Sequence, residues 1–167
     1  MRMAASKYPE LEPASGAAYV LLLRVASDML AAGDEYLAKF SLSQGRFIVL
    51  TLLYRVFDLP QNPCVLAEKA GVTRATMTGL LDGLEREGYI QRETSTEDRR
   101  MLEVRLTVKG KKFLEGVMPG FFRMVRQRME GLTMGEKEQM INLLTKLGAT
   151  AEISAAAANE VKVGESR

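Results

Sequence analysis

The sequence contains no histidine, no tryptophan and a single cysteine, Cys64. Without histidine the chain cannot build a Ser-His-Asp or Cys-His catalytic site, nor a zinc site of mixed Cys and His ligands by itself. One cysteine cannot form a disulfide within the chain, which is typical of a reducing compartment. Glycine-rich phosphate loops are also missing. An enzyme is therefore the least supported class of function, and no cofactor is expected.

The sequence also lacks a long apolar run. The apolar stretch 17–23 ends at Arg24, whereas a membrane span needs about 20 residues. The polar start of the chain does not have the pattern of an export signal. We therefore expect a cytoplasmic protein with no membrane partner, whose 47% of hydrophobic residues form a globular core.

Apolar residues recur at helical spacing along most of the chain. The expected helices span about 15–40, 44–57, 64–70, 74–87, 108–129 and 134–157. Four helices begin after a hydroxyl side chain that can cap the first turn: Ser43, Thr73, Thr107 and Thr133. Pro119 lacks the backbone N–H that an inner helical position needs. We therefore expect Pro119 and Gly120 to kink or interrupt the fifth helix.

The middle of the chain has the pattern of a winged helix. The helices at 64–70 and 74–87 are joined by a tight turn containing Gly71, which is the helix-turn-helix arrangement. Apolar and polar residues then alternate over 89–94 and 101–106, which predicts a β-hairpin wing. The predicted fold class is mainly α with a small β-hairpin (α+β): a winged helix-turn-helix with a helical dimerisation region.

The helix at 74–87 is predicted to turn Ala75, Gly79, Asp82 and Arg86 away from the core, with Thr76 and Thr78 on the flanks of this face. Small side chains let a helix approach base edges in the major groove of DNA. Such an approach would also explain Gly79 and Gly83, since each glycine costs a helix about 1 kcal/mol relative to alanine. The alternative is an ordinary amphipathic helix whose outward residues have no function. The candidate DNA contacts here are Arg74, Ala75, Thr76, Thr78, Gly79 and Arg86.

Positive charge is concentrated around the predicted wing. Residues 99–112 contain six cations and one acid, although the whole chain carries only +2. Arg99 and Arg100 at the hairpin tip can enter a narrow minor groove, where negative potential is concentrated. Asp98 beside them can brace one guanidinium by a salt bridge. The alternative is a solvated turn with ordinary surface charges.

The terminal helices carry more apolar surface than a small winged domain can cover. A two-fold dimer is the commonest way to bury such surface, and the alternative is that these helices pack on each other within one chain. The residues concerned are Leu21, Leu22, Val25, Met29, Phe113, Val117, Met118, Phe121, Phe122, Val125, Met140, Ile141, Leu144 and Leu147.

Three further features are left open by the sequence. Cys64 at a helix start is either a small packed residue, which we favour, or a single-thiol oxidant sensor. Methionines such as Met118 and Met124 belong either to the core, which is commoner, or to an adaptable ligand pocket. Arg46, Arg123 and Arg126 are candidates for contact with an anionic ligand.

Several runs of the sequence resemble the MarR family of bacterial winged-helix regulators. They are 42–47, 66–90, the tip Asp98-Arg99-Arg100 and the run Leu106-Thr107-Val108-Lys109-Gly110. The aspartate-arginine tip followed by a strand that ends in Leu-Thr-x-x-Gly is the specific part of the resemblance, which covers about residues 15–148.

The resemblance implies a homodimer that binds a near-palindromic operator in double-stranded DNA, usually as a repressor. Many members are released by a small effector, often phenolic or otherwise anionic, that lies between the dimerisation helices and the winged domain. By motif, Arg100 would enter the minor groove braced by Asp98, Arg99 would contact the backbone, and Arg74, Thr76 and Thr78 would face the major groove. The expected regions are a flexible N-terminus at 1–14, a dimerisation helix at 15–42, the winged domain at 43–107, C-terminal dimerisation helices at 108–157 and a flexible tail at 158–167.

The main competing function is a winged-helix protein-interaction module that does not bind DNA, because fold alone does not determine function. Such a module is expected to expose an apolar patch in place of the small-residue helix face and the cation cluster. That cluster comprises Arg99, Arg100, Lys109, Lys111 and Lys112.

Overall fold

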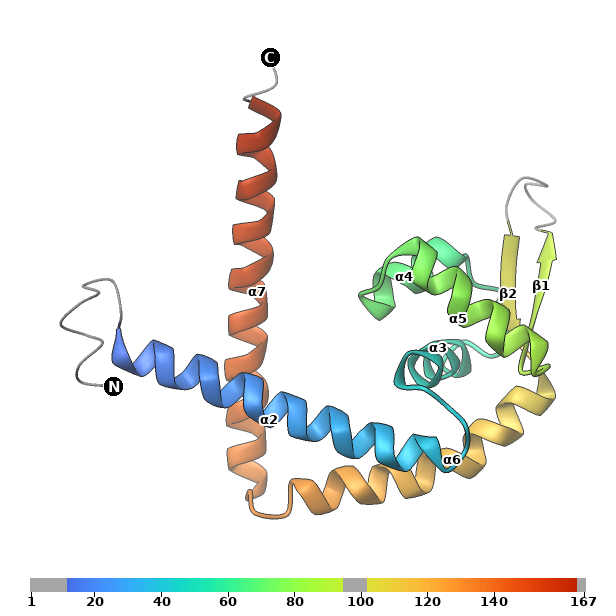
Figure 1. Ribbon diagram of the computed structural model, residues 1–167, viewed down its shortest axis with the longest axis horizontal. Helices are drawn as coiled ribbons and strands as arrows, with labels where there is room; N and C mark the ends of the chain where they lie inside the picture. The colour runs from blue at the N-terminus through green and yellow to red at the C-terminus, as the bar shows by residue number, and fades with distance from the viewer. Residues whose placement is uncertain (1–11, 95–101, 165–167) are drawn as a thin grey trace. The chain divides into compact units, whose positions relative to one another are not determined.

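The computed structural model describes residues 12–94 and 102–164. The chain divides into two compact units, residues 1–125 and 126–167. In chain order the elements are α2 (Pro13–Ala38), α3 (Gln44–Tyr54), α4 (Pro63–Ala70), α5 (Arg74–Arg86), β1 (Ile90–Thr94), β2 (Leu102–Leu106), α6 (Val108–Arg128) and α7 (Met134–Gly164) (Figure 1). This is the predicted order, and the fold class is confirmed as mainly α with one antiparallel hairpin.

Local hydrogen bonds fix where the helices begin, and all four predicted caps are confirmed. At α7 the Thr133 backbone N–H donates to Glu136 Oε2 (2.8 Å), and the Glu136 N–H donates back to Thr133 Oγ1 (3.3 Å). The backbone and hydroxyl bonds from Thr133 lower the pKa of the Glu136 carboxyl, because they favour its ionised form. The other capping hydroxyls accept from a backbone N–H three residues on, at 3.0–3.4 Å: Ser43, Thr73 and Thr107.

The helix-turn-helix and the hairpin enclose one core. Helices α3, α4 and α5 pack on one another, and the hairpin lies beside α5 (Figure 1). Gln61, just before α4, extends the sheet, because its backbone exchanges two 2.9 Å hydrogen bonds with Val104 of β2. The side chains that are almost fully buried are Leu37, Val49, Leu50, Leu53, Leu66, Met77, Leu81, Leu84, Val104, Leu114 and Val117.

Helix α6 continues through Pro119, so of the expected kink or interruption the interruption does not occur. Packing before the proline holds the helix together, because Leu114 and Val117 are buried in the core. The Tyr36 hydroxyl of α2 also donates to the Val117 carbonyl oxygen at 2.9 Å. Gly120 makes room for that tyrosine, since a Cβ there would overlap the Tyr36 hydroxyl.

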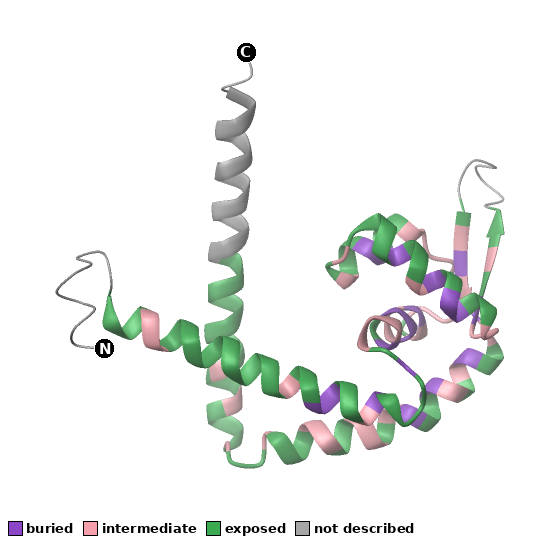
Figure 2. Cartoon of the chain, viewed as in Figure 1, coloured by how far each residue is buried: buried purple, intermediate pink, exposed green. Residues whose placement is uncertain are grey.

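Helix α2 is buried only towards its C-terminal end, at Ala32, Gly33 and Leu37 (Figure 2). By length and composition alone α2 could cross a membrane, a test that buried core helices of soluble proteins and N-terminal signal sequences also pass. Its upstream apolar side chains lie on the surface of the described chain. They include Tyr19, Val20, Leu21, Leu22, Leu23 and Val25.

Helix α7 belongs to the second unit and runs to Gly164, beyond the expected end at 157. Four of its large apolar residues are exposed in the described chain: Ile141, Leu143, Leu144 and Leu147.

Candidate nucleic-acid interface

Helix α5 has two sharply different faces. Met77, Leu81 and Leu84 point into the core. The structure brings the predicted contact residues together on the opposite, exposed face: Arg74, Ala75, Thr76, Thr78, Gly79 and Arg86. Within α5, which is described in full, no large apolar side chain is exposed. This face therefore lacks the apolar patch expected of a protein-interaction module.

The polar groups on this face differ in what they can still bind. The Thr78 hydroxyl donates to the Arg74 carbonyl oxygen at 3.0 Å, and the Thr76 hydroxyl shares a 2.9 Å hydrogen bond with that of Thr73. Arg74 and Arg86 make no ion pair with any other described residue. The guanidinium groups near the two ends of α5 are thus the strongest free donors on this face.

The two glycines of α5 have different reasons to be glycine. Gly79 is exposed, and a Cβ there would meet nothing within 4 Å. Gly83 is buried, and a Cβ there would lie 2.6 Å from Arg46 Cζ. Arg46 crosses over Gly83 to reach Glu87, with Nη1 and Oε1 2.7 Å apart. The expectation that Gly83 serves close approach to DNA is therefore wrong, whereas Gly79 stays a candidate.

Arg92 ties the wing to α5, a role that was not predicted from the sequence. Its guanidinium pairs with Asp82 (2.7 Å) and Glu85 (3.6 Å), and it also donates to the Thr78 carbonyl oxygen (3.3 Å). An arginine two residues after buried Ile90 on β1, facing acids spaced three apart on a helix, is the pattern that could have revealed it. Helix α5 and the hairpin are therefore directly connected.

Much of the basic stretch after the wing is used inside the fold. Arg105 pairs with Glu93 at 3.6 Å. Lys109 donates to the Glu87 carbonyl oxygen at 2.6 Å, and the Lys111 ammonium lies 4.5 Å from the centre of the Phe57 ring. Lys109 and Lys111 thus contact other segments of the fold and keep their positive charge. The predicted tip residues Asp98, Arg99 and Arg100 lie outside the described residues.

The structure gives the surroundings of Cys64 and Arg46, whose roles the sequence left open. Cys64 is exposed, so the expectation of a packed cysteine is wrong. Arg46 is partly buried and pairs with Glu87.

A cavity of about 370 Å³ lies within the first unit, between α2, the start of α3 and α6. Among the lining residues that the structure describes, Gln44 supplies the only side-chain amide and none is charged. The remaining lining residues are Ala26, Met29, Leu30, Gly33, Phe121, Met124 and Val125. Met29 and Met124 thus line a cavity, whereas Met118 packs against the core.

Fold and site together define a winged helix-turn-helix protein. The MarR family model matches residues 42–102. The chain is 36% identical over 143 residues to the HTH-type transcriptional repressor YetL of Bacillus subtilis, covering 86% of each protein. It is 30% identical to the transcriptional repressor MprA of Escherichia coli K12, covering 76% of this chain and 72% of MprA.

Solved structures agree with this match. The crystal structure of an S. aureus MepR–DNA complex superposes with a TM-score of 0.71 at 28% identity, covering 79% of this chain and 96% of MepR. At 23% identity, a mutant MarR from E. coli complexed with operator DNA shares the fold, with a TM-score of 0.70 and coverage of 76% and 90% of the two chains. The chain belongs to the MarR family and is a transcriptional regulator, not an enzyme.

Proposed function

We propose that this protein is a cytoplasmic, homodimeric repressor that binds a near-palindromic operator and leaves it when a small effector binds. The observation that carries the DNA-binding proposal is the outward face of α5, which is small in its middle and cationic at both ends. The names of YetL and MprA support repression, and the MepR–DNA complex supports a DNA partner.

In this proposal α5 lies in the major groove. Ala75 and Gly79 allow close approach to the bases, and Arg74, Thr76 and Thr78 donate to base edges or phosphates. Arg86, near the other end of α5, neutralises a phosphate. At the wing, Arg100 enters the minor groove with Asp98 as its brace, and Arg99 contacts the DNA backbone.

Capture of genomic DNA fragments by the purified protein would supply the operator and show whether its half-sites are about 10 base pairs apart. Titrations of that operator at several salt concentrations then test the contacts. Arg100→Ala is expected to weaken binding by about 1–3 kcal/mol, and Arg74→Ala to reduce the salt slope by about 1 if Arg74 holds a phosphate. Lys137→Ala, which removes a cation of α7, is the matched control and should leave operator affinity unchanged. Wild-type affinity of Arg100→Ala would remove the wing from the interface.

The dimer is proposed to form through the exposed apolar residues of α2 and α7. Burying apolar surface contributes about 25 cal/mol per Å², and a two-fold pair brings equivalent surfaces together. Leu22→Glu and Leu144→Glu should therefore produce monomers in sedimentation experiments. Ala14→Glu, which places the same charge at the exposed start of α2, is the control and should stay dimeric. The helical regions 15–42 and 108–157 would then be the dimerisation regions, with the winged domain at 43–107 between them.

The 370 Å³ cavity is the proposed effector site. Its apolar walls and the single amide of Gln44 favour a flat, uncharged molecule with one hydrogen-bonding group, and a phenol suits them better than a carboxylate. Val125→Trp would fill the cavity. This variant is expected to keep operator affinity and to lose release by the compound that releases the wild-type protein.

Three consecutive residues connect this cavity to α5. Gln44 lines the cavity, a Cβ on Gly45 would lie 3.0 Å from Leu80 Cδ2, and Arg46 rests on Gly83 and pairs with Glu87. A ligand that moves Gln44 therefore pushes on the inner side of the recognition helix. Arg46→Met should weaken the effector's influence on DNA affinity more than it weakens DNA binding itself.

A further inference from the structure

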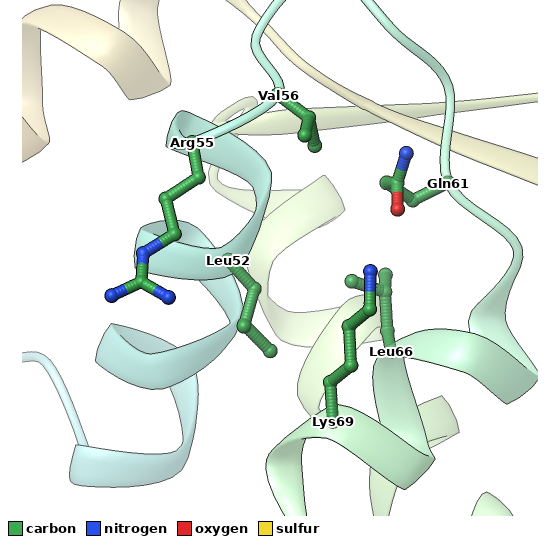
Figure 3. A pocket seen from close by; sticks show the side chains of 6 residues that line it. All are labelled: Leu52, Arg55, Val56, Gln61, Leu66 and Lys69. Carbon is green, nitrogen blue, oxygen red and sulfur yellow. The ribbon is translucent and has the colours of Figure 1, made fainter.

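A second cavity, of about 390 Å³, opens between the end of α3, the segment that follows it, and α4 (Figure 3). Leu52, Val56 and Leu66 form its apolar walls, and Leu66 is almost fully buried. Its polar lining consists of Arg55, Gln61 and Lys69. None of these residues lines the proposed effector cavity or belongs to the DNA-facing surface of α5.

The charged residues among the described lining of this cavity are of one sign. None of these lining residues is acidic, and neither Arg55 nor Lys69 makes an ion pair with another described residue. Elsewhere in the first unit Arg46, Arg92 and Arg105 all have carboxylate partners. Two unneutralised cations at the edge of an apolar hollow attract an anion.

The amide of Gln61 is held in a defined orientation. Its backbone pairs with Val104, and its Nε2 donates to the Pro60 carbonyl oxygen at 2.8 Å, which leaves Oε1 as the free acceptor. Figure 3 shows the Gln61 amide and the Lys69 ammonium at the same end of the cavity, above Leu66, with the Arg55 guanidinium on the other side of Leu52. The hollow therefore has a polar end and an apolar floor.

The helix ends nearby set the charge that the anion can carry. Arg55 is the C-cap of α3, and Lys69 lies in the last turn of α4. A helix C-terminus carries partial negative charge, which disfavours a dianion such as a phosphate monoester. A singly charged carboxylate is attracted by the two side chains and repelled less by the helix ends.

We propose that this cavity binds a small organic monocarboxylate with an apolar tail. The carboxylate accepts a hydrogen bond from Lys69, Arg55 adds positive potential from the other side of Leu52, and the tail lies on Leu52, Val56 and Leu66. Because its walls come from α3 and α4, such a ligand fastens the first helix of the helix-turn-helix to the helix behind it. This makes it a second ligand site, separate from the one proposed to release DNA.

Octanoate is a suitable probe, titrated into the full-length protein without DNA by calorimetry and by methyl NMR. We expect chemical-shift changes at Val56 and Leu66 and an affinity about tenfold lower for Lys69→Gln, as the loss of a charge-assisted hydrogen bond predicts. Arg55→Gln should weaken binding less, because its guanidinium lies at the rim. Lys112→Gln, which removes an exposed cation outside the cavity, is the matched control and should bind like wild type.

Two other probes separate charge from apolar contact. Octan-1-ol and inorganic phosphate should each bind at least about tenfold more weakly than octanoate, since each lacks half of the recognition. The proposal would be overturned if octan-1-ol or phosphate bound as tightly as octanoate, or if Lys69→Gln left octanoate affinity unchanged. Arg55 and Lys69 would then interact only with the helix dipoles.

Octanoate can also enter the apolar effector cavity, so its location must be measured. Val125→Trp closes that cavity and should leave octanoate binding intact. If this variant loses octanoate binding, and octanoate shifts Leu30 instead of Leu66 in the wild-type protein, the ligand occupies the effector cavity and the proposal is refuted. Because no DNA is present, either result leaves the proposal of operator binding untouched.

Discussion

Gly110, in the first turn of α6, lies against the base of the hairpin and offers a quantitative test of this packing. It is buried, and a Cβ there would overlap the Tyr89 carbonyl oxygen and lie 2.9 Å from Leu106 Cδ1. The Tyr89 carbonyl cannot retreat freely, because it accepts hydrogen bonds from the Thr107 N–H (3.0 Å) and the Thr107 hydroxyl (3.1 Å). An alanine at position 110 must therefore displace backbone.

The magnitude follows from three opposing contributions to the free energy of unfolding. Overpacking costs about 1–3 kcal/mol and a lost hydrogen bond about 1 kcal/mol, whereas alanine gains about 1 kcal/mol of helix propensity. Gly110→Ala should therefore destabilise the protein by about 1–3 kcal/mol. At about 2–4 °C per kcal/mol for a chain of this length, Tm should fall by roughly 2–12 °C.

Gly116→Ala is the matched control, because Gly116 is an exposed residue of the same helix and a Cβ there would meet nothing within 4 Å. It should raise stability by about 1 kcal/mol through propensity alone. Circular dichroism melts of both variants, at equal protein concentration, measure the two changes in Tm. If the Gly110 variant melts as high as the Gly116 variant, the reasoning about the α6–hairpin contact is refuted.

Three other predictions concern single interactions. Tyr36→Phe should lower the free energy of unfolding in urea by about 1 kcal/mol, since it removes the hydrogen bond to the Val117 carbonyl; an unchanged midpoint would contradict this. Thr133→Ala should raise the pKa of Glu136 towards its ordinary value in an NMR titration. Because the folded-state pKa is lowered, this capping box stabilises above the ordinary carboxyl pKa, and its contribution is lost as pH falls through the lowered value. Gly79→Ala should raise the melting temperature yet weaken operator binding, and unchanged affinity would exclude Gly79 from the interface.

Features determined by a few neighbouring residues could be predicted from the sequence. Each cap depends on a hydroxyl and an N–H three positions away, so Ser43 and Thr73 mark their helices correctly. Gly71 and Gly88 end helices in the left-handed region, at φ 66° and 73°, where other residues are strained. The order of elements, and the exposed face of α5, follow from such local rules and from periodicity.

Features that depend on distant residues could not be predicted. Pro119 suggested a broken helix, but the contacts that hold α6 together through it come from α2 and the core. Gly83 suggested a DNA contact, but the side chain above it is Arg46, far away in the sequence. The contacts that Lys109 and Lys111 make with a carbonyl oxygen and an aromatic ring were not predicted, because these partners lie on other segments.

The Arg92 link between β1 and α5 has a consequence for the DNA that such a protein can accept. Through Asp82, Glu85 and the Thr78 carbonyl, the hairpin and α5 hold a fixed separation. If these two elements read adjacent grooves, as proposed, the groove-to-groove distance is imposed by the protein. An operator with the correct bases but a different helical twist would then be bound less well, so repression would respond to the torsional state of the chromosome.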